Sequence, residues 1–315
     1  MFDFVKKLRF CLLPCALSAV VLSAGCGSQK PNDAHPRNAA SGGASAFVFM
    51  SDLQADPETG DYSAFGLLLE KALSRTNAPR LLVLGGDNVN NGSSEDEWRA
   101  LKAAAGSGID GITVASAAGN HDSHALLLEQ FDYPDSAPGS SQNGFFYSFT
   151  HEDIFFLVLD SNIMGAGNER DAEWVEEQLT SAAATSSNWQ IAVCHHPFYP
   201  ISQIPKDLVR AETMRAVFLP ILEERGVDLI LCGHQHLYAR TAAMLGGVPD
   251  GGGLVQLMTA SGSKESYSPS DNEYIEITAG APAYIVIEAT PETLEITTFD
   301  ELGEPFDSVQ IGRRN

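Results

Sequence analysis

The chain has 315 residues, enough for one large domain or two small ones, and its hydrophobic content of 44% allows a sizeable core. The net charge of −22 repels nucleic-acid backbones, so we exclude a general binder of DNA or RNA. It also repels anionic substrates. Because the part of the chain beyond the N-terminal leader shows no Lys or Arg cluster, a site for a phosphate group would need a metal cation.

The N-terminal segment has the pattern of an export signal. Lys6, Lys7 and Arg9 are followed by an apolar stretch over 10–24 that is too short for a transmembrane span of about 20 residues. The sequence "VLSAGC" resembles a bacterial lipobox, although Ser23 stands where Leu is usual. We therefore predict a signal peptide over 1–25 and a diacylated Cys26; the alternative is an ordinary cleaved signal in which Cys26 has no role.

Residues 26–45 are rich in Gly, Ser, Asn, Ala and Pro and show no apolar periodicity, which predicts a flexible tether. Several buried acyl chains at about 0.8 kcal/mol per CH₂ would anchor the protein firmly. We expect an exported protein that is held by lipid on a bacterial membrane or envelope, at the periplasmic or extracellular face.

From residue 46 onward, short apolar runs alternate with helical patterns. The apolar runs are at 46–50, 80–86 and 111–119, and the helices are expected at 62–76 and 94–106, the second with Ser94 and Glu97 as a capping box. Such alternation predicts a parallel sheet that is covered on both faces.

The second half begins with a hairpin around "HED" and continues with helices at about 169–184 and 209–225. Apolar runs at 190–195 and 227–233 accompany them, and mostly short strands follow. We predict a single domain over 46–315 with two sheets and outer helices. Cys194 and Cys232 end two of the apolar runs and are expected to be buried free thiols, because neighbouring parallel strands seldom suit a disulfide; the alternative is that they pair, as an exported protein would allow.

Polar clusters follow five of the apolar runs. They are "SDLQ" at 51–54, "GGDN" at 85–88, "GNHDSH" at 119–124, "HHP" at 195–197 and "GHQH" at 233–236. Functional groups gather at the carboxyl ends of parallel strands, so these side chains are expected at one edge. They supply carboxylates, an amide oxygen and up to four imidazoles, a donor set that suits Zn, Mn or Fe.

In order and spacing, these clusters resemble the motifs of the calcineurin-like metallophosphoesterase family, from residue 46 to about 240. "GHQHLYAR" and the final strands are most similar to the purple acid phosphatase branch, whose usual N-terminal β-sandwich is absent here. The resemblance implies a four-layer α/β/β/α sandwich of two mixed sheets flanked by helices.

The resemblance also implies a role for each motif residue. Asp52 and His236 would hold one metal ion, Asp87 would bridge both ions, and the second ion would be held by Asn120, His195 and His234. His121 would lie over the site and stabilise the phosphoryl oxygens or protonate the leaving group, and Asp122 would orient it. The cofactors would be two divalent or trivalent ions (Fe, Mn or Zn).

Two positions depart from relatives. Gln54 stands where many members have His, and it is a metal ligand only if its carbonyl oxygen contributes. Asn90 stands where purple acid phosphatases have a metal-binding Tyr, so we expect no purple colour. Some relatives carry Gln at the first position, so activity is not excluded.

Other polar residues near the motifs have simpler explanations. His124 and His196 are expected to be pocket-wall or supporting groups, and Asp160 a structural carboxylate that accepts hydrogen bonds from the backbone. Tyr199 and Arg240 are candidates for substrate binding, although an ion pair on a strand face explains Arg240 equally well. The segments 200–210 and 261–280 are expected to form the rim of the site.

The sequence therefore predicts hydrolysis of a small phosphate ester by a hydroxide bridging two metals, with a phosphomonoester favoured. One alternative is a phosphodiesterase that acts on cyclic nucleotides or other diesters. The other is a degenerate lipoprotein that binds a ligand at the cell surface without turnover, which only Gln54 and Asn90 favour.

Overall fold

The computed structural model describes residues 45–75, 80–134, 145–164 and 169–314 of the chain. The predicted signal peptide, Cys26 and the linker up to residue 44 lie outside these ranges. Within them, no helix combines the length and the apolar character that crossing a membrane requires.

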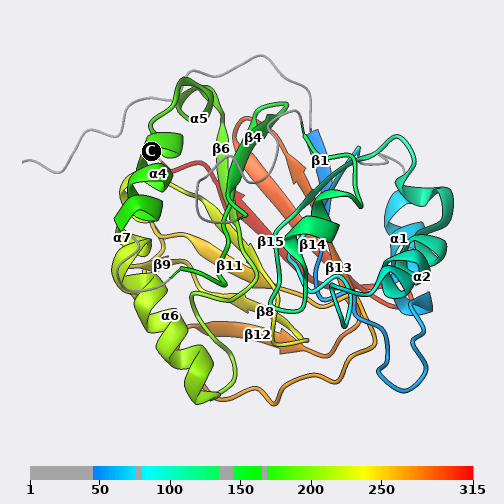
Figure 1. Cartoon of the computed structure of the whole chain (residues 1–315). Coiled ribbons are helices and arrows are strands. Elements are labelled where there is room, and N and C mark those ends of the chain that lie inside the picture. The colour runs from blue at the N-terminus through cyan, green and yellow to red at the C-terminus, as the bar shows by residue number, and fades with distance from the viewer. Residues whose placement is uncertain (1–44, 76–79, 135–144, 165–168, 315) are drawn as a thin grey trace, which may run out of the picture. The chain divides into compact units, whose positions relative to one another are not determined.

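Two mixed β-sheets form the centre of the fold (Figure 1). The first sheet has six strands in the order β15-β14-β13-β1-β2-β3, and the second has seven in the order β12-β8-β11-β7-β6-β5-β4. Strands β1, β2 and β3 run parallel, as do β5, β6, β7 and β11, and the remaining pairings are antiparallel. The strands of the first sheet are β1 (Ser45–Met50), β2 (Leu81–Leu84), β3 (Thr113–Ser116), β13 (Ala283–Ala289), β14 (Thr293–Asp300) and β15 (Pro305–Gly312). Those of the second are β4 (Tyr147–His151), β5 (Ile154–Val158), β6 (Trp189–Val193), β7 (Leu229–Cys232), β8 (Tyr238–Thr241), β11 (Val255–Met258) and β12 (Ile275–Ala279), and a separate hairpin pairs β9 (Met244–Leu245) with β10 (Val248–Pro249).

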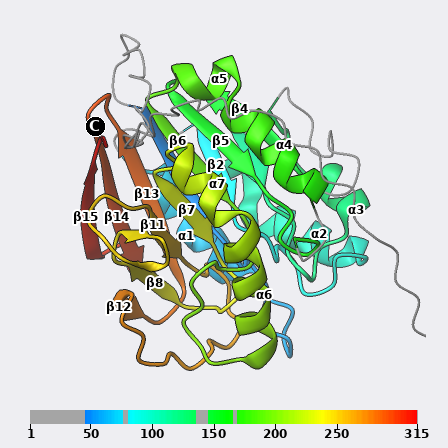
Figure 2. The same cartoon turned by 90° about the vertical axis from the view of Figure 1, so that its left-hand side faces the viewer.

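Helices cover the outer face of each sheet (Figures 1 and 2). The first sheet is covered by α1 (Ser63–Leu73) and α2 (Glu95–Ala105), and the second by α4 (Glu169–Leu179), α5 (Ala182–Ser186), α6 (Pro205–Val217) and α7 (Leu219–Glu224). A 3₁₀ turn, η1 (Gly106–Ile109), follows α2, and the short α3 (His124–Leu128) follows β3. This arrangement confirms the predicted sandwich of two mixed sheets flanked by helices.

The side chains of the seven-stranded sheet alternate between two cores. Phe156, Ile191 and Leu229 belong to the core shared with the first sheet. The next residue along the chain in β6 and in β7, Ala192 and Ile230, belongs to the core under α4–α7. Because successive residues of a strand point to opposite faces, a sheet that is buried on both sides needs unbroken apolar runs. Cys194 and Cys232 follow the same rule and are buried free thiols, as predicted.

Helix boundaries show where local chemistry overrides the periodicity of the sequence. Ser94 caps α2 as predicted, and its side chain accepts a hydrogen bond from Glu97 N. The single helix predicted at 209–225 is wrong: α6 ends at Val217 and α7 begins at Leu219, where Pro220 removes a backbone donor. The helix predicted at 169–184 also divides, because Ser181 caps a new helix, α5.

Candidate metal centre

The polar clusters lie at the carboxyl ends of strands, and their backbone is strained. Asp52 follows β1, Asp87 follows β2, and His234 and His236 follow β7. These four residues have φ angles of 48°, 51°, 77° and 51°, in the left-handed region, and Glu152 in the hairpin turn is the one further non-Gly residue with positive φ in the described part of the chain. Such strain costs about 1–3 kcal/mol per residue, and its concentration at four of the predicted site residues makes this edge a candidate functional site.

The Asp52 carboxylate is tightly held on one side and free on the other. Its Oδ2 accepts hydrogen bonds from Ser51 Oγ at 2.7 Å and His234 N at 2.8 Å. A Cβ atom at position 233 would lie 2.0 Å from this oxygen, so only glycine allows the "GHQH" loop to approach Asp52. The other oxygen, Oδ1, is buried without a hydrogen-bond partner and lies 3.5 Å from His236 Nε2.

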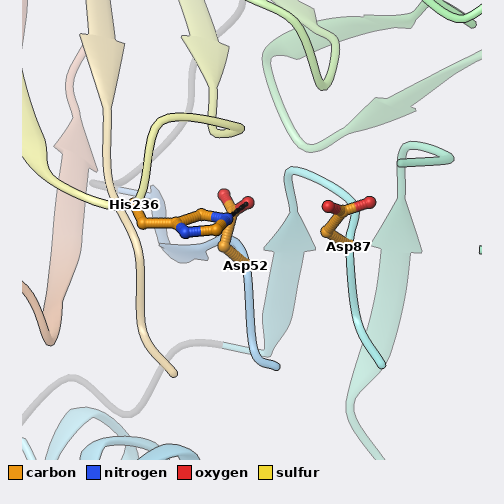
Figure 3. Close-up of side chains that lie close together, drawn as sticks. All are labelled: Asp52, Asp87 and His236. Atoms are coloured by element: carbon orange, nitrogen blue, oxygen red, sulfur yellow. Dashed lines mark ion pairs between the residues drawn. The ribbon is translucent and has the colours of Figure 1, made fainter. Parts of the chain in front are cut away.

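Asp87 completes a group of three candidate ligands. Its Oδ1 accepts a hydrogen bond from His121 N at 2.8 Å, and its Oδ2 lies 3.4 Å from His195 Nε2. Asp52, Asp87 and His236 can each offer one ligand atom, and these atoms all lie within 4.8 Å of one another. Figure 3 shows the His236 ring beside the Asp52 carboxylate, with Asp87 on the neighbouring loop.

Hydrogen bonds away from the centre fix which nitrogen of each histidine carries the proton. His195 Nδ1 lies 3.0 Å from Gly85 O, and His236 Nδ1 lies 2.8 Å from Glu265 O. A carbonyl oxygen only accepts, so both Nδ1 atoms donate, and Nε2 is the nitrogen that each ring directs to the centre.

His234 has the opposite tautomer. Its Nε2 lies 3.1 Å from Asp207 Oδ1, an electrostatic contact that is not aligned as a straight hydrogen bond. The carboxylate favours a proton on Nε2, so the Nδ1 lone pair is directed to His195 Nε2 at 3.3 Å. Nε2 of His195 and Nε2 of His236 thus each face a carboxylate of the centre, and Nδ1 of His234 faces His195.

The donor set of this arrangement suits a metal cation. Gln54 Oε1 adds a second buried oxygen without a partner to that of Asp52, and unpaired buried acceptors are costly. Burial alone lowers the pKa of His195, but the Asp87 carboxylate overcomes that effect and raises the pKa to about 9. Burial lowers the pKa of His234. Imidazole nitrogens, carboxylates and amide oxygens are ligand types that fit Zn, Mn or Fe.

The amide residues occupy distinct places around the centre. Gln54 is buried and donates through Nε2 to Val89 O at 3.3 Å, which leaves its oxygen free. Asn120 lies in the loop after β3 and is exposed. Asn90, at the position of the absent tyrosine, donates through Nδ2 to Ala55 O at 3.0 Å and accepts at its backbone oxygen from His121 Nδ1 at 2.7 Å.

The expected pairing of Asp122 with His121 is wrong. Asp122 accepts hydrogen bonds from Gly119 N at 2.9 Å and Asn88 N at 3.0 Å, so it joins two loops of the site. Asn90 O orients the His121 ring instead. Burial and the nearby Asp87 charge raise the pKa of Asp122 to about 7.

Arg240 does not face the centre. Its guanidinium forms a forked ion pair with Asp307, with Nε 2.8 Å from Oδ2, and it also pairs with Glu276. The substrate-binding role predicted for Arg240 is therefore wrong. The alternative prediction, an ion pair on a strand face, describes the residue correctly.

Tyr199 is also not a free pocket residue. Its ring is 2% exposed in the core under the α4–α7 helices and packs against Tyr274. Burial raises the pKa of its hydroxyl to about 12. The substrate-binding role predicted for Tyr199 is therefore wrong.

The supporting residues agree with their simpler explanations. Asp160 accepts hydrogen bonds from the backbone of Phe145 and Asn162, at 3.0 and 3.1 Å, and pairs with His124. His196 is buried, and its Nδ1 lies 2.9 Å from Ser161 Oγ.

Two charged residues of the centre were not identified from the sequence. Asp207, in the first turn of α6, contacts His234, and Lys264 Nζ lies 3.3 Å from His121 Nε2. Both come from the segments expected to form the rim, which indicated their place but not their roles. Neither stands directly after a buried strand, so the strand-end pattern did not reveal them.

Comparison with known proteins agrees with this geometry. The model of the calcineurin-like phosphoesterase family matches residues 45–238, more than half of the chain. The chain belongs to this family. The match confirms the predicted family, and with the purple acid phosphatase relatives it supports a metal-dependent phosphoesterase.

Relatives within the calcineurin-like phosphoesterase family include purple acid phosphatases. Purple acid phosphatase 15 of Arabidopsis thaliana is 29% identical over 112 residues, which span 36% of this chain and 20% of the relative. The chain thus matches only about a fifth of that protein's length.

Two solved structures share the fold. Purple acid phosphatase PPD1 from yellow lupin (Lupinus luteus) superposes with a TM-score of 0.70 at 15% identity, over 86% of this chain and 54% of that chain. GAP50, described as the anchor in the inner membrane complex of Plasmodium, superposes with a TM-score of 0.66 at 15% identity, over 86% of this chain and 90% of that one.

Proposed function

We propose that this chain hydrolyses a small phosphate ester, with a phosphomonoester favoured, at a centre that holds two metal ions. One observation carries the proposal: Asp52, Asp87 and His236 each offer a ligand atom within 4.8 Å of the others, and His195 Nε2 lies 3.4 Å from Asp87 Oδ2. The family membership and the purple acid phosphatase relatives support the same chemistry.

The residues divide into two ligand sets around Asp87. Asp52 and His236, with the free oxygen of Gln54, would hold one ion, and His195, His234 and Asn120 would hold the other. Zn, Mn or Fe would neutralise the phosphoryl oxygens and lower the pKa of a bound water from about 15.7 towards 7.

The chain itself supplies positioning and proton transfer. His121 donates its Nδ1 proton to Asn90 O, so Nε2 is the nitrogen that can take up a proton and pass it to the leaving oxygen. Asp122 keeps the loops at 119 and 88 together and so fixes the position of His121. In a chain of net charge −22, the bound cations would attract the anionic substrate.

Metal content and substrate choice test the proposal. We expect about two ions of Zn, Mn or Fe per chain and faster turnover of nitrophenyl phosphate than of bis(nitrophenyl) phosphate. Faster turnover of the diester would favour the phosphodiesterase alternative. Fewer than about one ion per chain without turnover would favour a non-catalytic binding protein.

A single carboxylate variant tests the bridging role. Asp87→Asn should lose both ions and reduce kcat by at least about 10³-fold, because it removes a charge shared by both ions. Asp171→Asn is the control, since Asp171 is a buried carboxylate of α4. Retained metal and turnover in Asp87→Asn would refute the bridging role.

We also propose that the protein is exported and anchored through a lipid on Cys26, on the strength of the "VLSAGC" sequence. Cys26→Ser should move the protein from the membrane fraction to the soluble fraction. Cys15→Ser, inside the predicted signal, is the control. Unchanged membrane fractionation of Cys26→Ser would contradict lipid anchoring.

A further inference from the structure

The segment 261–267 crosses the centre and is attached to two of its loops, the one after β1 and the one after β7. Ser261 N donates to Ser51 O at 2.7 Å, and Ser263 N donates to Gln54 O at 2.9 Å. Glu265 O accepts from His236 Nδ1, and Tyr267 N donates to Gln235 O at 3.1 Å. The segment is therefore part of the site rather than a loose rim.

Close approach to the β1 loop requires glycine at position 262. A Cβ atom there would lie 2.3 Å from Gln54 O and 2.6 Å from Asp52 O, far inside van der Waals contact. Lys264 follows two residues later, between the anchored residues Ser263 and Glu265. Its backbone is thus fixed on both sides, next to Glu265, whose carbonyl oxygen accepts from His236.

The Lys264 side chain extends to the residue expected over the substrate. Nζ lies 3.3 Å from His121 Nε2, and because an ammonium only donates, the ring nitrogen accepts. The lysine is half-buried. Burial lowers the pKa of Lys264, whereas the negative charges of Asp87 and Asp52 act to raise it. A cation thus stands next to His121 in a chain with 41 acidic and 19 basic residues.

We infer that Lys264 binds a non-bridging phosphoryl oxygen of the substrate beside His121 and selects monoesters over diesters. The inference rests on the proposed function. A monoester carries about one more negative charge at neutral pH than a diester, so an ammonium at this position favours it electrostatically. A diester also replaces one of the free oxygens with an ester group, which gives the ammonium fewer strong acceptors.

Two variants at position 264 separate charge from shape. Lys264→Met keeps the length of the side chain and removes the charge, and Lys264→Arg keeps the charge. Lys102→Met, on α2, is the control. We expect Lys264→Met to lower kcat/KM for nitrophenyl phosphate about 10- to 100-fold and that for bis(nitrophenyl) phosphate less than about threefold. Lys264→Arg should recover part of the loss, and metal content and Tm should not change.

A binding measurement distinguishes this inference from the proposed function. Calorimetric titration of the metal-loaded protein with inorganic phosphate should show affinity about 10-fold or more weaker in Lys264→Met than in wild type and in Lys102→Met. If wild type hydrolyses neither ester but Lys264→Met still weakens phosphate binding, the proposed function fails and the phosphate site stands. Equal losses for both esters, loss of metal, or unchanged phosphate binding in Lys264→Met would overturn the inference.

Discussion

Each histidine of the centre is orientated by an acceptor that is not itself a candidate ligand. The acceptors are Gly85 O for His195, Glu265 O for His236 and the Asp207 carboxylate for His234. Such partners fix the tautomer and raise the basicity of the ligand nitrogen. Two of these acceptors are backbone oxygens, whereas that of His234 is the Asp207 side chain. A substitution can therefore remove the Asp207 acceptor without changing the backbone.

We predict that Asp207→Asn weakens metal binding about 10- to 100-fold while the protein still folds. An amide can place its NH₂ group toward His234 Nε2, which shifts the proton to Nδ1 and removes the lone pair from the centre. Competition with a chelator of known affinity measures the change. Asp96→Asn is the control, because Asp96 lies in the first turn of α2 and pairs with the exposed Arg99. Equal affinities in the two variants would contradict the orientating role of Asp207.

At the scale of the elements, the parallel strands explain why the sequence predicted so much of the site. β1, β2 and β3, and β6 with β7, end at the same edge, so residues that follow buried runs had to meet. The contacts that bring rim residues to the centre depend on tertiary structure. Asp207 reaches His234 because α6 begins at Pro205, and Lys264 is positioned by a close approach at Gly262. Neither the start of α6 nor the close approach at Gly262 produces a periodic pattern in the sequence.

The role of Arg240 was also predicted wrongly because it depends on a tertiary contact. Strand β8 belongs to the seven-stranded sheet and β15 to the six-stranded sheet, and the Arg240–Asp307 pair connects them. The two strands are 64 or more residues apart in sequence, because β8 ends at Thr241 and β15 begins at Pro305. Strand alternation alone could not show which acid would face Arg240.

We predict that Arg240→Met lowers the free energy of unfolding by about 1–3 kcal/mol and changes kcat/KM less than about twofold. Burial raises the pKa of Asp307, but its hydrogen bonds from Arg240 outweigh this and lower it. The stabilisation is therefore present above the ordinary pKa of 3.8 and is lost as pH falls through the lowered value. Urea unfolding at pH 7 and pH 3 measures both effects.

Arg240→Met should thus lose less stability than wild type on acidification. Arg99→Met removes an exposed ion pair with Asp96 and should change stability by less than about 1 kcal/mol. A large fall in kcat/KM for Arg240→Met with unchanged stability would restore the substrate-binding assignment.

At the scale of the whole molecule, the two sheets hold the centre from opposite sides. The six-stranded sheet supplies Asp52 and Asp87 through β1 and β2, and the seven-stranded sheet supplies three histidines through β6 and β7. A cation between these groups contacts both sheets at once. Its binding free energy therefore adds to the stability of the packed sheets, and not only to that of a local loop.

We predict that Zn, Mn or Fe raises the Tm of the chelator-treated protein. A free ion at 100 times its Kd stabilises the folded state by about 2.7 kcal/mol, which corresponds to roughly 5 °C or more for a domain of this size. Scanning calorimetry with and without each ion measures the shift, and Asp87→Asn is the matched control because it removes one charge from the centre. If an ion raises the Tm of Asp87→Asn as much as that of wild type, it binds elsewhere, and the assignment of the centre between the two sheets is wrong.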